Sequence, residues 1–385
     1  MKIVFASDSF KGSLSSEKIS KLLEEVTPKV FPQAQLVSLA VADGGEGTMS
    51  VLVKALNGSI KEVITRNPLG KKIKASYGLL PNQTAIIEMA RASGLPLIEK
   101  KERHPMKTSS YGTGLLIRDA LDNKVNHILI ALGGSATNDG GMGAMSALGF
   151  RFFDKNGHQL KGSGQDLWQV SEIDVSHAHQ RLKEVTITIL SDVTNPLLGD
   201  KGATYTYSKQ KGANSSMQEL LEAGMTHFAK IVEKTTNKQL KNLQGTGAAG
   251  GLAFSLMAFL KADITPGIDT ILDFLSFDNL IKDADLIVTG EGRLDKQSSF
   301  GKVVSGISKR GQKFGIPVVA IVGGLSENYE NIYADGLSSI ITTVNRIMPF
   351  EEALKNSEEL YKDAAYRILN AVKVGMTISQ KNKNI

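Results

Sequence analysis

One pattern recurs along this 385-residue chain and restricts its possible folds: a short apolar run, a loop rich in glycine or serine, and a stretch with apolar residues at helical spacing. The clearest instance has an apolar run at 127–132, a glycine-rich loop at 133–141 and an apolar stretch at 142–148. Strands that are apolar almost throughout are typical of parallel sheets buried on both faces. The alternation therefore predicts an α/β protein with parallel strands joined by helices. The other expected strands are residues 2–6, 36–40, 185–190, 285–289, 317–322 and 339–343.

Two stretches interrupt the alternation and indicate a second domain. Residues 59–89 alternate strands with turns, and residues 150–280 combine a turn at 154–157 with a long helix at 216–235. The chain length suits two domains of roughly 150 residues or more. We expect the second domain to be inserted into the first, so that both are discontinuous. The domain with the mostly parallel sheet comprises residues 1–58, 105–149 and 281–385; the smaller, mixed α/β domain comprises 59–104 and 150–280.

Composition excludes several classes of protein. The chain has no cysteine, which rules out thiol nucleophiles, zinc–thiolate sites and iron–sulfur clusters. The first apolar run ends at Asp8 and is too short for a signal peptide, and no apolar run is long enough to span a membrane. The net charge of +6 comes from scattered basic residues without a nucleic-acid-binding motif. We expect a cytoplasmic protein that acts on a small molecule, not on nucleic acid or membranes.

Glycine-rich loops are the first candidate binding elements. In a parallel sheet, ligands bind at the carboxyl ends of strands, where helix N-termini offer N–H groups to anions. Loops at 44–47, 133–141 and 290–292 follow expected strands, so together they favour a phosphate ligand. The segment 245–250 matches the dinucleotide fingerprint formally, but no apolar strand precedes it. It remains a candidate phosphate-binding helix N-terminus, and P-loop and protein-kinase motifs are absent from the sequence.

Charged side chains are concentrated in the same loops. The loop carboxylates are Asp8, Asp43, Glu46, Asp139, Asp192, Glu291 and Asp295. Some could cap helices and turns, but beside phosphate loops they also suit Mg²⁺. Asp192 follows the 185–190 strand and precedes Val-Thr-Asn-Pro, where no helix cap is needed. Lys11 and Arg293 lie in polar strand-end loops and suit an anionic ligand, whereas Lys209 and Lys211 could equally be surface charges.

Eight motifs in this order resemble the bacterial glycerate kinases that phosphorylate glycerate with ATP. They include Asp-Ser-Phe-Lys-Gly-Ser-Leu at 8–14 and Thr-Gly-Glu-Gly-Arg-Leu-Asp at 289–295. The others lie at 41–48, 110–114, 132–141, 192–197, 210–213 and 245–251, so the resemblance covers nearly the whole chain. It implies a two-domain α/β fold, with one domain Rossmann-like and the active site in the cleft between the domains. It also implies transfer of the ATP γ-phosphoryl group to a glycerate hydroxyl, in most members giving 2-phosphoglycerate. ATP and Mg²⁺ are the implied co-substrate and metal.

Roles for individual residues follow from residue type and loop position. Asp192 is expected to act as the general base or as a Mg²⁺ partner, with Glu291 as a second metal ligand. Lys11 and Arg293 are expected to neutralise the glycerate carboxylate and the transferring phosphoryl group. The expected substrate-binding residues are Asp8, Ser9, Ser110, Tyr111 and Arg66. The expected nucleotide-binding residues are Gly133, Gly134, Ser135, Asn138, Gly245, Gly247, Gly250 and Gly290.

Other functions stay open at this point. A glycerate kinase could phosphorylate the 3-hydroxyl, or accept a related small hydroxy acid. A nicotinamide-dependent dehydrogenase fits the α/β pattern, but the first strand is not followed by the fingerprint. A sensor that binds sugar acids without turnover is a third possibility, against which the carboxylates in the phosphate loops argue.

Overall fold

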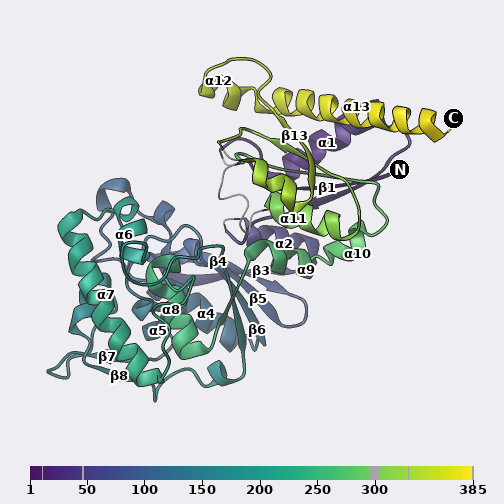
Figure 1. The fold of residues 1–385 in the computed structure, drawn as a ribbon. Helices are drawn as coiled ribbons and strands as arrows, with labels where there is room; N and C mark the ends of the chain where they lie inside the picture. Colours follow the sequence, from purple (N-terminus) through teal and green to yellow (C-terminus); the bar gives the residue numbers. More distant parts are fainter. Residues whose placement is uncertain (11, 46, 295–302, 328, 384–385) are drawn as a thin grey trace. The chain divides into compact units, whose positions relative to one another are not determined.

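The computed structural model describes residues 1–10, 12–45, 47–294, 303–327 and 329–383. The chain forms two compact units (Figure 1). Met1–Asp43 and Gly267–Ile385 make up the flanking unit, and Gly44–Pro266 make up the central unit. The described part of the chain contains no helix that is both long enough and apolar enough to cross a membrane.

The flanking unit is built on a five-stranded sheet in the order β13-β12-β11-β1-β2. Every neighbouring pair is parallel. β1, β11 and β12 are largely buried, as the sequence predicts for a sheet covered on both faces. The strands are β1 (Lys2–Ser7), β2 (Gln35–Ala40), β11 (Leu286–Glu291), β12 (Val318–Val322) and β13 (Leu337–Thr342).

Helices from both ends of the chain pack on this sheet. α1 and α13 lie side by side although they come from opposite ends of the sequence (Figure 1). Ile3 and Phe5 of β1 share a buried cluster with Leu22 of α1 and Tyr361 of α13. α11 contacts β11, β12 and β13. The helices are α1 (Ser16–Val30), α9 (Gly267–Phe274), α10 (Phe277–Ile281), α11 (Val303–Lys313), α12 (Phe350–Lys355) and α13 (Ser357–Lys383).

The central unit contains a six-stranded mixed sheet in the order β10-β9-β6-β5-β4-β3. The first four strands are parallel to one another, and β4 and β3 are antiparallel additions at one edge. A separate antiparallel pair joins β7 and β8. The strands are β3 (Ser59–Arg66), β4 (Lys72–Leu80), β5 (Thr84–Glu88), β6 (His127–Ala131), β7 (Arg151–Phe153), β8 (Glu172–Asp174), β9 (Thr186–Leu190) and β10 (Asp263–Thr265).

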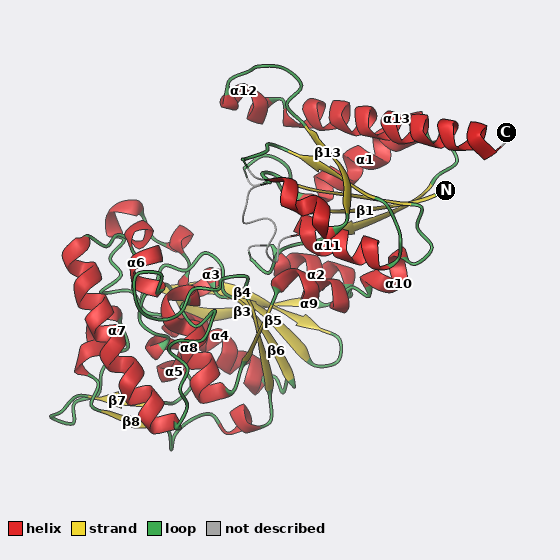
Figure 2. Cartoon of the chain, viewed as in Figure 1, coloured by secondary structure: helices red, strands yellow, loops and turns green. Residues whose placement is uncertain are grey.

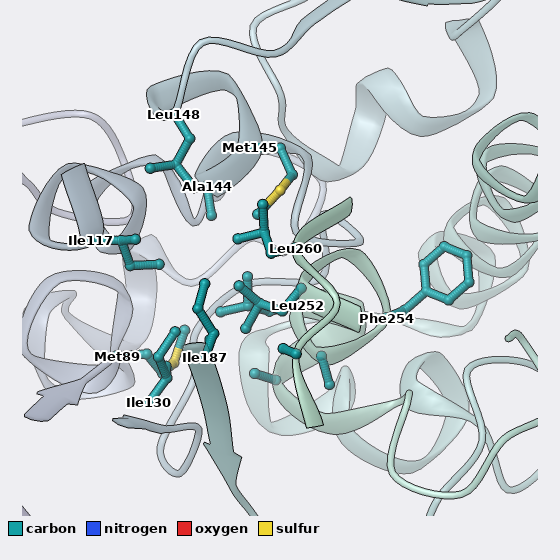
Figure 3. Close-up of a cluster of buried hydrophobic side chains, with 14 of the residues drawn as sticks. Met89, Ile117, Ile130, Ala144, Met145, Leu148, Ile187, Leu252, Phe254 and Leu260 are labelled. Atoms are coloured by element: carbon teal, nitrogen blue, oxygen red, sulfur yellow. The ribbon is translucent and has the colours of Figure 1, made fainter. Parts of the chain in front are cut away.

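Helices lie beside this sheet (Figure 2), and their buried side chains share one hydrophobic cluster with those of the strands. Figure 3 shows Ile130 of β6 and Ile187 of β9 facing a core to which Ile117 of α4, Met145 of α5 and Leu252 of α8 contribute. α2 contacts β4 and β5. The helices are α2 (Thr48–Ala55), α3 (Ala90–Ser93), α4 (Tyr111–Asp122), α5 (Met142–Ala147), α6 (Ala203–Tyr207), α7 (Ser215–Thr236) and α8 (Ala248–Leu260).

The observed division of the chain differs from the expected one. Residues 105–149 were expected with the first strand, but β6 pairs with β5 and β9 in the central unit. The central unit is one continuous segment, and it is the longer of the two. The physical reason is that strand pairing depends on long-range register: the apolar run at 127–132 is equally suited to either sheet. The α/β class and the mostly parallel sheets agree with the expectation.

Local elements agree more closely with the sequence. The long helix expected at 216–235 is α7 (Ser215–Thr236), and the turn at 154–157 closes through a hydrogen bond from the Gly157 N–H to the Asp154 carbonyl oxygen (3.0 Å). The final helix, expected at 351–372, is interrupted at Asn356 and continues as α13.

Candidate active site

The carboxyl edge of the flanking sheet carries a pocket of about 540 Å³. Each strand contributes a residue at its carboxyl end: Asp8 after β1, Asp43 after β2, Glu291 at the end of β11, Gly323 after β12 and Thr343 after β13. Parallel strands deliver all these residues to one edge because their carboxyl ends coincide. The volume is typical of a site for a small molecule.

The polar part of this pocket combines carboxylates with a guanidinium group. Asp8 is held by the sheet, because its N–H donates to the Gly290 carbonyl oxygen (2.9 Å). Its carboxylate accepts a hydrogen bond from the Ser9 N–H (2.6 Å). Arg293 donates from Nε to the Ser326 hydroxyl (3.0 Å). Asp8, Ser9, Glu291 and Arg293, which the sequence selected, therefore line the same pocket.

Another part of the pocket lining is apolar. It is formed by Phe10, Leu325 and Val344 together with Phe350 and Leu354 of α12. A lining that combines apolar side chains with carboxylates and a guanidinium group suits a ligand with both a polar or charged part and an apolar part.

Gly290, expected to bind nucleotide, has a packing role in β11. A Cβ atom built on it would lie 2.1 Å from the Ile321 carbonyl oxygen of the neighbouring strand. This distance is incompatible with any side chain, so the spacing of β11 and β12 requires glycine here. Lys11, an expected catalytic residue, lies outside the described residues, as do Glu46 and Asp295.

Three loops of the central unit that the sequence selected meet in the structure. A Cβ atom on Gly247 would lie 2.3 Å from the Pro196 carbonyl oxygen, and one on Gly250 would lie 2.1 Å from the Thr137 carbonyl oxygen. The Gly247 N–H also donates to the Asn195 carbonyl oxygen (3.0 Å). Segments 133–141, 192–197 and 245–250 are thus in direct main-chain contact, and glycine permits that approach.

The sequence indicates that the segment 245–250 could be a helix N-terminus. In the structure it is not a regular helix N-terminus. Ala249, Gly250 and Gly251 all have left-handed φ values, between +54° and +87°. Gly245 is also left-handed, with φ of +84°. Regular helical conformation in α8 therefore begins only after Gly251, and the glycines form a tight loop against the 133–141 segment.

Asp192 lies at the carboxyl end of β9 and is half-buried. The loop it begins is well braced. The Val193 N–H donates to the Ser191 hydroxyl (3.3 Å), and the Tyr207 hydroxyl donates to Oδ1 of Asn195 (2.6 Å). The Asn195 side-chain amide in turn donates to the Lys201 carbonyl oxygen (2.7 Å). A carboxylate on a braced strand-end loop is suited to proton transfer, which needs fixed geometry.

Ser110 is fully buried and is engaged inside the protein. Its N–H and its hydroxyl each donate to Oδ2 of Asp139 at 2.7 Å, and the hydroxyl also accepts from the Ala144 N–H (3.0 Å). The Asp139 carboxylate receives further hydrogen bonds from the N–H groups of Gly141 and Gly143 (both 3.2 Å). Burial raises the pKa of the Asp139 carboxyl, whereas these hydrogen bonds act in the opposite direction.

Arg66 and Tyr111, two further expected substrate-binding residues, lie on adjoining segments of the central unit. A Cβ atom on Gly112 would lie 2.0 Å from the Arg66 carbonyl oxygen, so the end of β3 touches the start of α4. The Arg66 guanidinium is exposed and donates to the Gly70 carbonyl oxygen (2.8 Å). Asp8 and Ser9 belong to the flanking unit.

The loop after β6 has an exposed arm and a buried arm. Gly133 and Gly134 are exposed, whereas Ser135 and Asn138 are buried. Asn138 donates from Nδ2 to the Thr204 hydroxyl (3.3 Å), and within the described part of the chain its Oδ1 has no hydrogen-bond partner. The exposed glycines are accessible to a phosphate, and the buried arm anchors them.

Lys211, which from the sequence could equally be a surface charge, is buried in the structure. It is only 1% exposed, and its Nζ donates to the Thr137 carbonyl oxygen (2.7 Å). Burial lowers the pKa of the Lys211 ammonium to about 7. In the sequence, the one sign that Lys211 differs from Lys209 is its place in the Gln-Lys-Gly-Ala motif. Lys209 lies outside that motif and is exposed.

Neither unit contains a preformed metal cage among its described residues, because no three His, Cys, Asp or Glu side chains are grouped to hold an ion. Oxygen donors are nevertheless present in the strand-end loops at Asp8, Asp43, Asp192 and Glu291. Mg²⁺ commonly binds through one or two protein carboxylates together with water and substrate phosphates. Asp8, Asp43 and Glu291 of the flanking unit, and separately Asp192 of the central unit, therefore suit a Mg²⁺ ion that binds together with phosphates.

Comparison with known proteins decides the family. A model of the glycerate kinase family matches residues 3–373. The chain belongs to the glycerate kinase family. It is 42% identical to a glycerate kinase of Halalkalibacterium halodurans, covering 95% of this chain and 97% of that protein. It is 39% identical to the glycerate 2-kinase of Escherichia coli K12, covering 98% and 99%.

A solved structure agrees with this assignment. The crystal structure of a Salmonella typhimurium LT2 protein provisionally named glycerate kinase 2 has a TM-score of 0.87 and 40% identity, covering 98% of this chain and 99% of that one. The resemblance read from the eight motifs is confirmed, as is the mixed α/β class. As a member of the glycerate kinase family, the chain is a kinase, a phosphotransferase whose acceptor is an alcohol group.

Proposed function

We propose that this glycerate kinase transfers the γ-phosphoryl group of ATP to the 2-hydroxyl of D-glycerate, with Mg²⁺, and releases 2-phospho-D-glycerate. The observation that carries the proposal is end-to-end similarity to a protein named glycerate 2-kinase, at 39% identity. The strand-end loops add support, since they supply carboxylates, a guanidinium group and exposed glycines. We also keep the cytoplasmic location inferred from the sequence.

Asp192 is our candidate for the base that accepts the proton of the attacking hydroxyl. Its position at a strand end, half-buried in a loop braced by Asn195, suits that role. A carboxylate that removes a hydroxyl proton during phosphoryl transfer must be held within hydrogen-bond reach of it. The Asn195 bracing provides a means of holding it.

Arg293 is our candidate for neutralising anionic charge in the flanking-unit pocket. Its Nε is committed to Ser326, which orients the guanidinium plane and leaves other donors for a carboxylate or a phosphoryl oxygen. Lys11 is assigned the same kind of role from the sequence. Phosphoryl transfer depends mainly on positioning and charge neutralisation, which these cations would supply.

The glycine-rich loops of the central unit are our candidates for binding the nucleotide phosphates. Gly133 and Gly134 expose their main chain, and Gly250 packs against the anchored arm of the same loop. Gly245 and Gly247 pack against the 192–197 segment. Glu291 and, as the alternative to its role as base, Asp192 are the residues we assign to Mg²⁺, which when bound would offset the negative charge of the phosphates.

A coupled assay tests the proposal. The purified protein is mixed with ATP, Mg²⁺ and D-glycerate, and ADP release is followed beside enolase-coupled product formation without added mutase. ADP together with an immediate enolase signal supports 2-phosphorylation. ADP with a signal only after mutase is added indicates the 3-phosphate instead. No ADP from a folded protein with D-glycerate, but ADP with a related hydroxy acid, would replace the proposed substrate.

A further inference from the structure

The side chain of Lys211 is buried, unlike that of an ordinary surface lysine. The residue ends the short 3-10 helix η5 (Lys209–Lys211), and the following Gly212 has a left-handed φ of +98°. A Cβ atom on Gly212 would lie 2.3 Å from the Arg103 carbonyl oxygen, so this turn is pressed against residue 103. The turn therefore directs the Lys211 side chain into the protein, where it is 1% exposed.

The buried ammonium is poorly compensated. An ammonium group has three donors, and in the part of the chain that the structure describes the Thr137 carbonyl oxygen (2.7 Å) is the one acceptor of Nζ. No carboxylate among the described residues lies within ion-pair distance of Nζ, and Asp139 acts on it only over a longer range. Burying a charge with a single neutral acceptor destabilises the folded state. An apolar side chain of similar length would fill the space without that penalty.

The atom that Lys211 holds lies at the meeting point of the candidate nucleotide loops. The Thr137 carbonyl is approached by Gly250 so closely that a Cβ atom there would be 2.1 Å away. The Gly250 carbonyl oxygen in turn accepts from the Gly140 N–H (3.0 Å). Lys211 thus links the 210–213 motif to the contact between the 133–141 and 245–250 loops.

Two buried polar groups close to the Thr137 carbonyl lack hydrogen-bond partners among the described residues. The Thr137 hydroxyl is buried and, among the described residues, has no hydrogen-bond partner; the same holds for Oδ1 of the adjacent Asn138. Neither group replaces Lys211 as a donor to the Thr137 carbonyl oxygen. Without the ammonium, that carbonyl would lose its hydrogen bond while its side-chain neighbours supplied nothing in return.

We propose that Lys211 is a positioning residue for the nucleotide-binding loops: its ammonium fixes the main chain at Thr137 and, through it, the exposed Gly133–Gly134 arm. The proposal rests on the proposed function in one respect, that these loops bind the phosphates of ATP. If Lys211 served stability, replacing it would destabilise the folded state. If it serves positioning, replacing it need not destabilise the folded state.

The test uses the full chain and compares Lys211→Met with Lys209→Met, a matched control because Lys209 is exposed in the same turn. Binding of Mg²⁺-ATP without acceptor is measured by titration calorimetry, kinetics with D-glycerate give KM and kcat, and thermal unfolding gives Tm. We expect Lys211→Met to weaken ATP binding about 10-fold or more, the scale of one lost hydrogen bond from a charged donor. KM for ATP should rise accordingly, kcat at saturating ATP should change less, and Tm should stay level or rise. Lys209→Met should change none of these.

Two results would overturn the proposal: ATP affinity at the wild-type level in Lys211→Met, or a clear fall in Tm or failure to fold. Lys211→Gln provides a second comparison, because its amide N–H can still donate; its ATP affinity should lie between those of the wild type and Lys211→Met. The proposed function fails separately, if wild-type protein binds ATP but does not phosphorylate glycerate. If wild-type protein binds no ATP, the loops have no nucleotide to position and both proposals fall.

Discussion

The hydroxyl of Ser110 and Oδ2 of Asp139 lie 2.7 Å apart in the interior of the central unit, and the Ser110 N–H reaches the same oxygen at the same distance. This pair joins the residue before α4 to the glycine-rich loop after β6. The Asp139 carboxylate then receives two N–H groups near the start of α5. A single buried carboxylate thereby organises three segments, which gives the anchored arm of the loop its rigidity.

Ser110→Ala should destabilise the protein by about 2 kcal/mol. The substitution removes a donor to the buried Asp139 carboxylate and an acceptor for the Ala144 N–H, and buried groups left unpaired carry the full desolvation penalty. Urea unfolding measures the change, with the exposed Ser216→Ala of α7 as the control. A loss below about 0.5 kcal/mol, the range of ordinary surface substitutions, would contradict the role given to this pair.

Gly250→Ala should be far more damaging than Gly199→Ala. Both glycines are left-handed, with φ of +67° and +86°, so the backbone strain of an alanine is similar. Only at Gly250 would the new Cβ also meet a neighbour, the Thr137 carbonyl oxygen at 2.1 Å, whereas nothing lies within 4 Å at Gly199. The difference in free energy of unfolding should be about 2 kcal/mol or more, with weaker ATP binding at Gly250 alone. Equal effects would show that the loop contact does not matter.

Asp192→Asn should lower kcat at least about 100-fold, the usual scale of lost acid–base catalysis, with little change in the KM for ATP. Steady-state kinetics with D-glycerate measure both constants. Asp200→Asn, exposed in the loop that continues from Asp192, is the control and should keep wild-type turnover. Turnover near the wild-type level in Asp192→Asn would remove this residue from the catalytic role.

Stability should depend on pH through Lys211. Burial lowers its pKa in the folded protein to about 7, from an ordinary value of 10.5, so between these pH values the unfolded chain binds more protons than the folded one. Stability from this group therefore rises with pH across that window, by up to about 1.4 kcal/mol per pH unit. Comparing urea unfolding of the wild type and Lys211→Met at pH 6.5 and pH 9 isolates the effect, because the variant lacks the titrating group.

The wild type should gain stability relative to Lys211→Met between these two pH values. A difference between the two proteins that stays constant with pH would mean that the ammonium is not destabilised by burial. Lys209→Met, which removes an exposed lysine, should follow the wild type throughout.

The sequence predicts the elements of this fold better than their assembly. The apolar run at 127–132 and the loop after it indicate a parallel strand and a strand-end site, and both are present. The sheet that this strand joins depends on its pairing with Thr84–Glu88 and Thr186–Leu190, which no local pattern reveals. The expected domain division failed to anticipate this pairing for that reason.

The site shows the same limit at the level of single side chains. Lys209 and Lys211 lie only two positions apart in the sequence, yet the side chain of Lys209 is exposed and that of Lys211 is buried. The difference comes from the left-handed turn at Gly212, which packs against residue 103 more than a hundred positions earlier. The carboxylates and Arg293 of the flanking pocket were predictable, because strand-end loops of a parallel sheet converge wherever their strands pair.

The most direct test of the central claim is the position of the phosphate in the product. Purified enzyme is incubated with ATP, Mg²⁺ and D-glycerate, and the product is examined by proton-coupled ³¹P NMR. A phosphate on the 2-hydroxyl couples to the single proton on its carbon and should appear as a doublet, which is the result we predict. A triplet, from coupling to the two protons of the terminal carbon, would show phosphorylation at the 3-hydroxyl and contradict the proposed reaction.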